Sequence, residues 1–287
     1  MDLKRLSILG VGLLGGSIGL AARSKLSDCH IVGYGHRRET LTRAQEIGAI
    51  HEAADNLGDA VKDADLIVLC TPVLLFGEVL KGIAGSLKPE AIVTDVGSTK
   101  RSVVELAGRL LPAHASFVGS HPMAGSEKRG VEFARTDLFE NALCILTPTD
   151  SSDAQAVTAV EEFWRLLGMR TCRMTPADHD AALADVSHLP HAVAAALVNM
   201  QRPEAMRLSG KGFLDATRIA GGDGGLWRDI FLDNADNVRA SIARLRRALD
   251  EFEGLIRARD GEKLRAWLDA AAARREELVR ERLRDEA

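Results

Sequence analysis

A glycine-rich turn near the N-terminus constrains the fold of this chain more than any other feature. Residues 6–9 predict a short apolar strand, the motif Gly10-x-Gly12-x-x-Gly15 follows directly, and residues 17–23 have a helical pattern. In that context the glycines permit a tight turn, let a pyrophosphate approach the backbone, and let helix and strand pack closely. The phosphates would bind free N–H groups at the positive end of the helix. We therefore expect a dinucleotide-binding unit; the alternative is a glycine-rich turn without a ligand.

Near-continuous apolar segments alternate with helical patterns through the next 160 residues. Such strands are typical of a parallel sheet covered by helices on both faces. The sequence predicts an α/β Rossmann-type N-terminal domain with a mostly parallel sheet. The expected strands are His30–Tyr34, Asp65–Cys70, Ala91–Asp95, Phe117–Val118, Leu143–Leu146 and Arg170–Met174, with helices at Glu39–Ile47 and Ala154–Leu167.

After residue 174 the sequence becomes almost entirely helical. Thr175 can cap a helix, Pro176 suits its first position, and Asp178 occupies the place of a capping-box acid. The segment Val193–Met200 is apolar nearly all round, so we expect it to be buried. We place the domain boundary there, with a dinucleotide-binding domain at 1–174 and a helical domain at 175–287.

The helical domain carries long apolar stripes. Apolar residues recur at spacings of three and four, which marks one face of a long helix. Such helices frequently form dimer interfaces, so we expect a homodimer through the all-α domain; the alternative is that the stripes pack only within the chain. The clearest stripe is Val238, Ile242, Leu245, Leu249 and Phe252.

Composition excludes several classes of function. The net charge is −4 and aromatic residues make up 4% of the chain, so a nucleic-acid-binding surface is not expected. The four cysteines lie far apart and form no C-x-x-C pair, which is typical of reduced thiols. The N-terminus has no signal-peptide pattern and we find no apolar run long enough to span a bilayer. We expect a cytoplasmic protein without a membrane partner.

The residues after the second strand bear on the choice of cofactor. An acid at the end of that strand would bind the ribose hydroxyls of NAD, but this chain has Gly35, followed by His36, Arg37 and Arg38. Arginine pairs with a 2′-phosphate through two hydrogen bonds, so we predict NADP rather than NAD. The alternative is that both arginines are surface charges at a helix start. Thr71-Pro72, at the end of another strand, is also expected to contact the cofactor.

Two segments of the sheet domain carry candidate catalytic groups. His121 lies in Gly119–Glu127, which we interpret as a rigid turn at the mouth of a pocket; histidine exchanges protons near neutral pH. The alternative for His121 is a structural hydrogen bond to the backbone. Ser98 lies in Asp95–Lys100, at the carboxyl end of a strand, where ligands bind in open α/β sheets. Ser98 is expected to face the reaction centre or to cap a helix, and Lys100 to lie on a helix surface.

The helical half has polar residues that we expect to line a pocket wall. His188 and His191 are three residues apart and share a helix face, and Pro190 predicts a kink or a new helix start near Ser187. No H-E-x-x-H or comparable ligand spacing accompanies these histidines or His179, so we predict no metal site. The guanidinium of Arg218, before a glycine-rich loop, can clamp a carboxylate; a salt bridge within the domain is the alternative.

Five motifs, in order, give the chain a resemblance to a known family. Along nearly its whole length the sequence resembles the prephenate/arogenate dehydrogenases of tyrosine biosynthesis. The histidine motifs are the most specific of the five. The matching segments are Gly10–Gly19, Asp95–Lys100, Gly119–Glu127, Ser187–His191 and Trp227–Asp229.

The resemblance implies an oxidative decarboxylation. Hydride passes from the hydroxyl-bearing ring carbon of the substrate to the nicotinamide, and carbon dioxide leaves as the ring becomes aromatic, so no metal is needed. His121 would accept the hydroxyl proton, Ser98 would support that geometry, and Arg218 would hold a substrate carboxylate. Further positions match residues that line, close or flank the entrance of the pocket. They are His179, His188, His191, Trp227 and, at the entrance, Glu127.

The match leaves substrate and regulation open. Prephenate and arogenate differ by a keto or amino group on the side chain; we expect prephenate, with arogenate as the alternative. The missing acid at Gly35 supports NADP. No regulatory domain fits after the helices, so tyrosine inhibition would act at the active site.

Two more distant classes of protein are also compatible with the sequence. One is a two-domain reductase such as a 3-hydroxyacid dehydrogenase or an imine reductase, which would rely on Lys100 or lack a base like His121. The second is a nucleotide-sensing protein without turnover. The polar residues concentrated on segments expected to meet at one pocket favour an enzyme over such a sensor.

Overall fold

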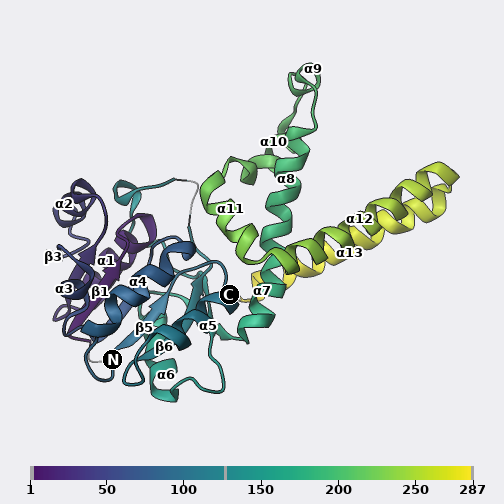
Figure 1. The fold of residues 1–287 in the computed structure, drawn as a ribbon. Coiled ribbons are helices and arrows are strands. Elements are labelled where there is room, and N and C mark those ends of the chain that lie inside the picture. The colour runs from purple at the N-terminus through teal and green to yellow at the C-terminus, as the bar shows by residue number, and fades with distance from the viewer. Residues whose placement is uncertain (1–2, 126–127, 286–287) are drawn as a thin grey trace. The chain divides into compact units, whose positions relative to one another are not determined.

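The computed structural model describes residues 3–125 and 128–285, which form two compact units, Met1–Ala235 and Asp236–Ala287. The first unit contains an eight-stranded sheet with the order β3-β2-β1-β4-β5-β6-β7-β8 (Figure 1). All neighbouring strands are parallel except β6 and β7. The predicted Rossmann-type sheet is confirmed. The strands are β1 Arg5–Leu9, β2 His30–Tyr34, β3 Glu52–Ala53, β4 Leu66–Leu69, β5 Ile92–Asp95, β6 Ser116–Pro122, β7 Leu143–Thr147 and β8 Arg170–Arg173.

Helices cover both faces of this sheet because alternate strand residues point to opposite sides. In β1, Ile8 packs into the core formed with α1, α2 and α6, whereas Leu9 packs into the core formed with α3, α4 and α5. Both residues are fully buried. The sheet helices are α1 Leu13–Lys25, α2 Arg38–Glu46, α3 Leu57–Val61, α4 Phe76–Ile83, α5 Arg101–Leu110 and α6 Ala154–Leu166.

Strand β6 changes partners along its length. It runs parallel to β5 as far as Val118, opposite Thr94, and then pairs antiparallel with β7 from Gly119 onward. His121 therefore lies within a strand, opposite Ile145, and the predicted turn at this position is wrong. The strand continues because β7 supplies hydrogen-bonding partners after β5 has ended. Pro122 is tolerated because β5 no longer requires its missing N–H.

The helical segment begins where the sequence predicts. Thr175 caps α7, Pro176–Leu183, by accepting a hydrogen bond from the Asp178 N–H at 3.1 Å. A π-helical turn, Ala184–His188, joins α7 to α8, Leu189–Asn199, which confirms an irregularity near Ser187. Pro190 lacks the N–H that a regular helix requires, so the backbone hydrogen bonds of this turn span five residues instead of four. As a domain boundary, the position near residue 174 stays a prediction. The later elements of this unit are α9 Pro203–Met206, α10 Lys211–Thr217, the 3-10 turn Arg218–Gly221 and α11 Gly224–Asp233.

Helix α8 is less buried than its composition predicts. Within Val193–Met200 only Ala194 is buried, and Met200 is 71% exposed, so the expectation of a buried helix is wrong for the single chain. The helix contacts α10, the turn after it and, through His191, Trp227 of α11, but most of its residues from Val193 onward stay partly or fully exposed. Among the described residues, the continuous helical run Pro176–Asn199 also has the length and mean hydropathy, 1.4, of a membrane span, contrary to our expectation. Length and composition alone do not distinguish a span from an apolar helix of a soluble protein.

The second unit is a helical hairpin. Helix α12, Ala235–Ala258, reverses direction at Arg259-Asp260 and continues as α13, Gly261–Asp285 (Figure 1). The rings of Phe252 and Trp267 lie 5.0 Å apart between the two helices. The predicted apolar stripe of α12 is partly exposed, with Leu249 at 55%.

Candidate active site

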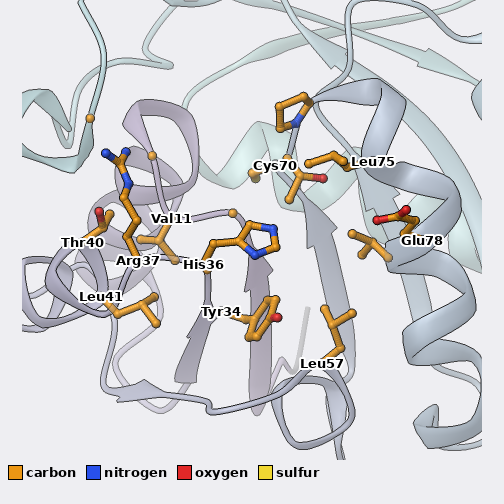
Figure 2. Close-up of a pocket in the computed structure, with 17 residues that line it drawn as sticks. Val11, Tyr34, His36, Arg37, Thr40, Leu41, Leu57, Cys70, Leu75 and Glu78 are labelled. Atoms are coloured by element: carbon orange, nitrogen blue, oxygen red, sulfur yellow. The ribbon is translucent and has the colours of Figure 1, made fainter.

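A cavity of about 320 Å³ lies at the carboxyl ends of the parallel strands, beside the glycine turn (Figure 2). Six of the residues predicted to bind cofactor line it: Gly10, Gly12, His36, Arg37, Thr71 and Pro72. Gly15 and Arg38 are not among the lining residues. This is the expected position of a dinucleotide site in a sheet of this topology.

The glycines fit a dinucleotide for distinct reasons. Gly10 has φ +107°, and a Cβ there would lie 2.6 Å from the carbonyl carbon of Cys70. A Cβ on Gly15 would lie 2.2 Å from the Gly10 oxygen, so this position holds helix and turn together. At Gly12 a Cβ would meet nothing within 4 Å, and α1 has no side-chain cap. Open space in front of uncapped helix N–H groups is what a pyrophosphate requires.

The side chains around the cavity suit a nucleotide. The Thr71 hydroxyl is buried and has no hydrogen-bond partner within the described residues, so it is available to a ligand. Arg37 pairs with no acidic side chain in the described parts of the chain and is exposed at the cavity wall. Arg38 instead pairs with Asp55 at 2.6 Å, in solvent. Figure 2 places Glu78 on the wall opposite Arg37, so the two ends of the cavity differ in charge.

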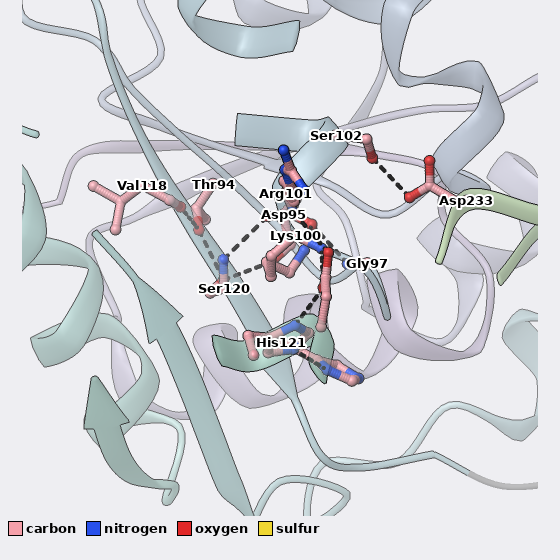
Figure 3. A network of polar contacts seen from close by, with 12 residues as sticks. Thr94, Asp95, Gly97, Lys100, Arg101, Ser102, Val118, Ser120, His121 and Asp233 are labelled. Carbon is pink, nitrogen blue, oxygen red and sulfur yellow. Dashed lines mark hydrogen bonds and ion pairs between the residues drawn. The ribbon is translucent and has the colours of Figure 1, made fainter. Parts of the chain in front are cut away.

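Asp95, at the end of β5, is the centre of a buried polar network (Figure 3). Its carboxylate accepts hydrogen bonds from Gly97 N–H at 2.8 Å and Ser120 N–H at 3.1 Å, and pairs with the Lys100 ammonium. Lys100 is 0% exposed, so the predicted helix-surface position is wrong. Its side chain folds back to Asp95 because an unpaired ammonium at this depth would be unstable. Gly119 makes room: a Cβ there would lie 3.3 Å from Lys100 Cδ.

Asp180, from α7, holds the start of α5. Its carboxylate accepts hydrogen bonds from Lys100 N–H at 2.8 Å and Arg101 N–H at 2.9 Å, two donors that the helix itself leaves unpaired. Burial acts to raise the pKa of Asp180, but the hydrogen bonds from His179 and these amides outweigh it and lower the pKa. Asp180 is therefore a fixed negative charge at the positive end of a helix.

From this carboxylate a chain of hydrogen bonds leads to His121. His179 Nδ1 lies 2.8 Å from Asp180 Oδ1, and His179 Nε2 lies 2.9 Å from His121 Nδ1. The ionised Asp180 only accepts, so His179 carries its proton on Nδ1. The neutral His179 then accepts at Nε2, which requires a proton on His121 Nδ1. By this assignment, Nε2 of His121 is left with a lone pair.

The electrostatic environment keeps His121 neutral, so the lone pair on its Nε2 is not protonated. Burial, followed by the charges of His179, Lys100 and His188, lowers the pKa of His121 well below its ordinary value. Burial also lowers the pKa of His179, although Asp180 opposes it. His121 is only 8% exposed, and its Nε2 has no hydrogen-bond partner among the described residues. The geometry therefore provides a neutral imidazole ready to accept a proton.

Ser98 lies in the loop between β5 and α5 and is half-buried. It does not cap α5, because Lys100 occupies the cap position and no side chain bonds there. Within the described residues the hydroxyl of Ser98 has no hydrogen-bond partner, so it is available to a ligand at this strand end.

A second cluster surrounds Trp227 on α11. The His191 ring stacks on Trp227 with centroids 3.4 Å apart, and the His188 ring lies edge-on at 6.2 Å. The Nδ1–H of His191 donates to the Ser187 carbonyl at 3.0 Å. Burial lowers the pKa of His191, with a contribution from the positive charge of Arg218. Arg218 is exposed and pairs with no acidic side chain among the described residues, so the alternative of an internal salt bridge is not seen there.

Two further site predictions stay predictions. Glu127 lies outside the described residues. Within the described residues no three His, Cys, Asp or Glu side chains are placed to hold a metal ion.

Sequence reasoning missed the residues that organise the histidines. Asp180 adjoins His179 in the sequence, but its contact with α5 spans about 80 positions. Asn234 follows Trp227 by seven residues, the spacing of one helix face, and bonds to both Asp180 and His188. That spacing was the one signal for Asn234.

A dinucleotide loop on a mostly parallel sheet, with a buried imidazole base and a helical second half, defines a nicotinamide-dependent dehydrogenase. Two family models match: the nucleotide-binding domain of prephenate dehydrogenase over residues 18–173 and its dimerization domain over residues 175–270. The chain belongs to the prephenate dehydrogenase family and is an oxidoreductase. The predicted family is thus confirmed.

Relatives with known names support this assignment. The chain is 37% identical to prephenate dehydrogenase of Bacillus subtilis, covering 94% of this chain and 75% of that one. It is 36% identical to cyclohexadienyl dehydrogenase of Zymomonas mobilis, covering 88% and 90%. A solved structure of prephenate dehydrogenase from A. aeolicus with hydroxyphenyl propionate and NAD+ has a TM-score of 0.91 at 36% identity, covering 97% and 99%.

Proposed function

We propose that this protein oxidises and decarboxylates prephenate to 4-hydroxyphenylpyruvate, with NADP as the preferred hydride acceptor. The observation that supports this most directly is the Asp180–His179–His121 chain, which leaves a lone pair on His121 Nε2. A ring hydroxyl whose carbon loses hydride needs such an acceptor. The names of the relatives support the substrate, because two of those compared are called prephenate dehydrogenase.

The chain's residues account for each proton and charge in the reaction. The bound nicotinamide supplies the hydride acceptor. His121 accepts a hydrogen bond from the ring hydroxyl and takes its proton as the carbon–oxygen bond gains double-bond character. The carbon–carboxylate bond then breaks and carbon dioxide leaves. The electron pair of that bond stays in the ring, which becomes aromatic. His121 returns the proton to the phenolic oxygen, so the base is regenerated.

Several further residues position the substrate. Arg218 pairs with no acidic side chain among the described residues and can bind a substrate carboxylate through two hydrogen bonds. Its charge already acts on His191, which stacks on Trp227, so these three form one wall of the proposed site. The free hydroxyl of Ser98 supports the hydroxyl–imidazole geometry at the end of β5.

The central experiment is a direct assay. The purified protein is incubated with NADP or NAD and either prephenate or arogenate, and the reduced cofactor is followed by its absorbance. We expect turnover with prephenate, and loss of about 10² to 10⁴ in kcat for His121→Asn with cofactor binding retained. Turnover with arogenate alone would replace prephenate by arogenate as substrate. Full activity of His121→Asn would refute the assigned base.

Arogenate remains the second candidate because one relative is named cyclohexadienyl dehydrogenase. Tyrosine is the product that arogenate would give, so it should fit the same site. We therefore propose that tyrosine inhibits by competing with the substrate. Inhibition that leaves the substrate KM unchanged would contradict that proposal.

The preference for NADP rests on the end of β2. Gly35 supplies no carboxylate to repel a 2′-phosphate, and Arg37 is available at the cavity wall. A Cβ on Gly35 would meet only Leu41 Cδ2, at 3.7 Å, so an aspartate fits there. We expect Gly35→Asp to favour NAD and Arg37→Ala to weaken NADP, measured as kcat/KM with each cofactor. Arg38→Ala is the matched control, because Arg38 pairs with Asp55 away from the cavity. A wild-type preference for NAD would refute this part.

The assembly is proposed to be a cytoplasmic homodimer. The second family model is described as a dimerization domain. Apolar side chains exposed in the single chain support an interface in this region; they include Met200, Leu208 and Leu214. Light scattering of the purified protein tests it, and a monomer at micromolar concentration would contradict it.

A further inference from the structure

Asn234 is a buried amide that the proposed chemistry does not yet use. It lies at the end of α11 and is 4% exposed. Its Nδ2 group donates to the main-chain oxygen of Asp180 at 2.7 Å and lies 3.1 Å from His188 Nδ1. The amide therefore connects α11, which carries Trp227, to α7 and to the π-helical turn.

The carbonyl of Asp180 decides which way this amide points. If the amide were flipped, its oxygen would face the Asp180 oxygen at hydrogen-bond distance, and two acceptors would repel each other. The NH₂ group must therefore face Asp180, and its second proton is directed to His188 Nδ1. His188 then accepts at Nδ1 and carries its own proton on Nε2.

His188 is suited to present that proton to a ligand. Burial lowers the pKa of His188 to about 4, so the ring is neutral near pH 7. The ring is 1% exposed and edge-on to Trp227. No described residue accepts a hydrogen bond from its Nε2.

We propose that Asn234 is a positioning residue that acts through His188, holding it in the Nε2–H form as a hydrogen-bond donor to a substrate oxygen. The proposal deepens the proposed function and rests on it for the identity of the substrate. It gives the two imidazoles opposite roles. His121 presents a lone pair set by the Asp180 carboxylate, and His188 presents an N–H set by the Asp180 carbonyl.

The first test reads the tautomer directly. In protein labelled with ¹⁵N-histidine, NMR distinguishes protonated from unprotonated ring nitrogens, and His188→Asn assigns the His188 signals. We expect Nε2–H in the wild type. In Asn234→Asp the carboxylate can only accept at neutral pH, so we expect the proton on Nδ1 or on both nitrogens. A wild-type His188 protonated on Nδ1 overturns the proposal even if no Asn234 variant folds. An unchanged tautomer in folded Asn234→Asp overturns it as well.

The second test separates positioning from structure. Asn234→Asp should raise the KM of the substrate by roughly tenfold or more, the scale of one lost hydrogen bond to a charged oxygen. In His188→Asn the same change should add little, because both act through one contact. Asp233→Asn is the matched control: Asp233 accepts from Ser102 at 2.7 Å and should leave KM and tautomer unchanged. Independent, multiplying effects of the two changes overturn the proposal. Wild-type protein inactive on both substrates refutes the proposed function alone, since the tautomer is read without turnover.

Discussion

Acidification should destabilise the fold through His188. The pKa of His188 is about 4 in the folded chain, against an ordinary value near 6.5, and the chief cause is burial. Between these two pH values His188 is protonated in the unfolded chain but not in the folded chain. Stability therefore falls as pH drops through 6.5 and continues to fall until His188 itself protonates near pH 4.

The size of the effect follows from the two pKa values. A difference of about 2.5 units corresponds to about 3.4 kcal/mol when the pH is well below 4. Linkage between two protonation states gives a loss of about 2 kcal/mol between pH 7 and pH 5. The pKa values of His121, His179 and His191 are also lowered, so their contributions have the same sign. A domain with about 5 to 15 kcal/mol of stability would register this loss clearly.

Urea unfolding at pH 7 and pH 5 measures this loss of stability. The protein concentration is held fixed because the second family model is described as a dimerization domain. His188→Gln keeps a polar side chain but does not titrate. Its free energy of unfolding should lose about 2 kcal/mol less than the wild type over this interval. Equal losses in the two proteins, with equal denaturant slopes, would refute the reasoning that His188 is buried as the neutral ring.

Three further predictions concern the polar network. Asp180→Asn removes the charge that orients His179, so kcat should fall about tenfold to a thousandfold while cofactor binding is kept, as steady-state kinetics and cofactor titration would show. An unchanged kcat would contradict the assigned tautomer. Lys100→Met leaves the Asp95 carboxylate buried without its ion pair, so thermal unfolding should show a loss of about 3 to 5 kcal/mol in stability. The double variant Lys100→Met/Asp95→Asn should recover part of that loss. Unchanged stability in Lys100→Met would mean that the pair is not buried. The acid limb of kcat/KM should lie below pH 6.5, because the pKa of His121 is lowered, and a limb above that value counts against His121 as the base.

Local signals predicted the parts of the fold that depend on few residues. The turn at Gly10–Gly15 and the cap at Thr175 are set by backbone geometry and a neighbour three residues away, and both formed as expected. The position of His121 depended on β7, which starts more than 20 residues later and extends β6 beyond β5. The burial of Lys100 depended on the carboxylate of Asp95, a partner that a surface pattern does not reveal. The sequence therefore indicated which residues could take part in the chemistry, but their protonation states depend on long-range contacts that only the structure shows.

Asp180 is the point at which these long-range contacts meet. Its carboxylate holds the first N–H groups of α5 and orients His179, while its carbonyl orients Asn234. Displacing this residue would disturb the lone pair of His121 and the N–H of His188 together. Asp180→Glu keeps the charge but lengthens the side chain by one methylene, so it should impair His121 through His179 and leave the main-chain contact to Asn234 in place. We therefore expect a loss in kcat without the tautomer change at His188 that Asn234→Asp produces. A variant in which both imidazoles change together would show that the carboxylate, not the carbonyl, controls His188.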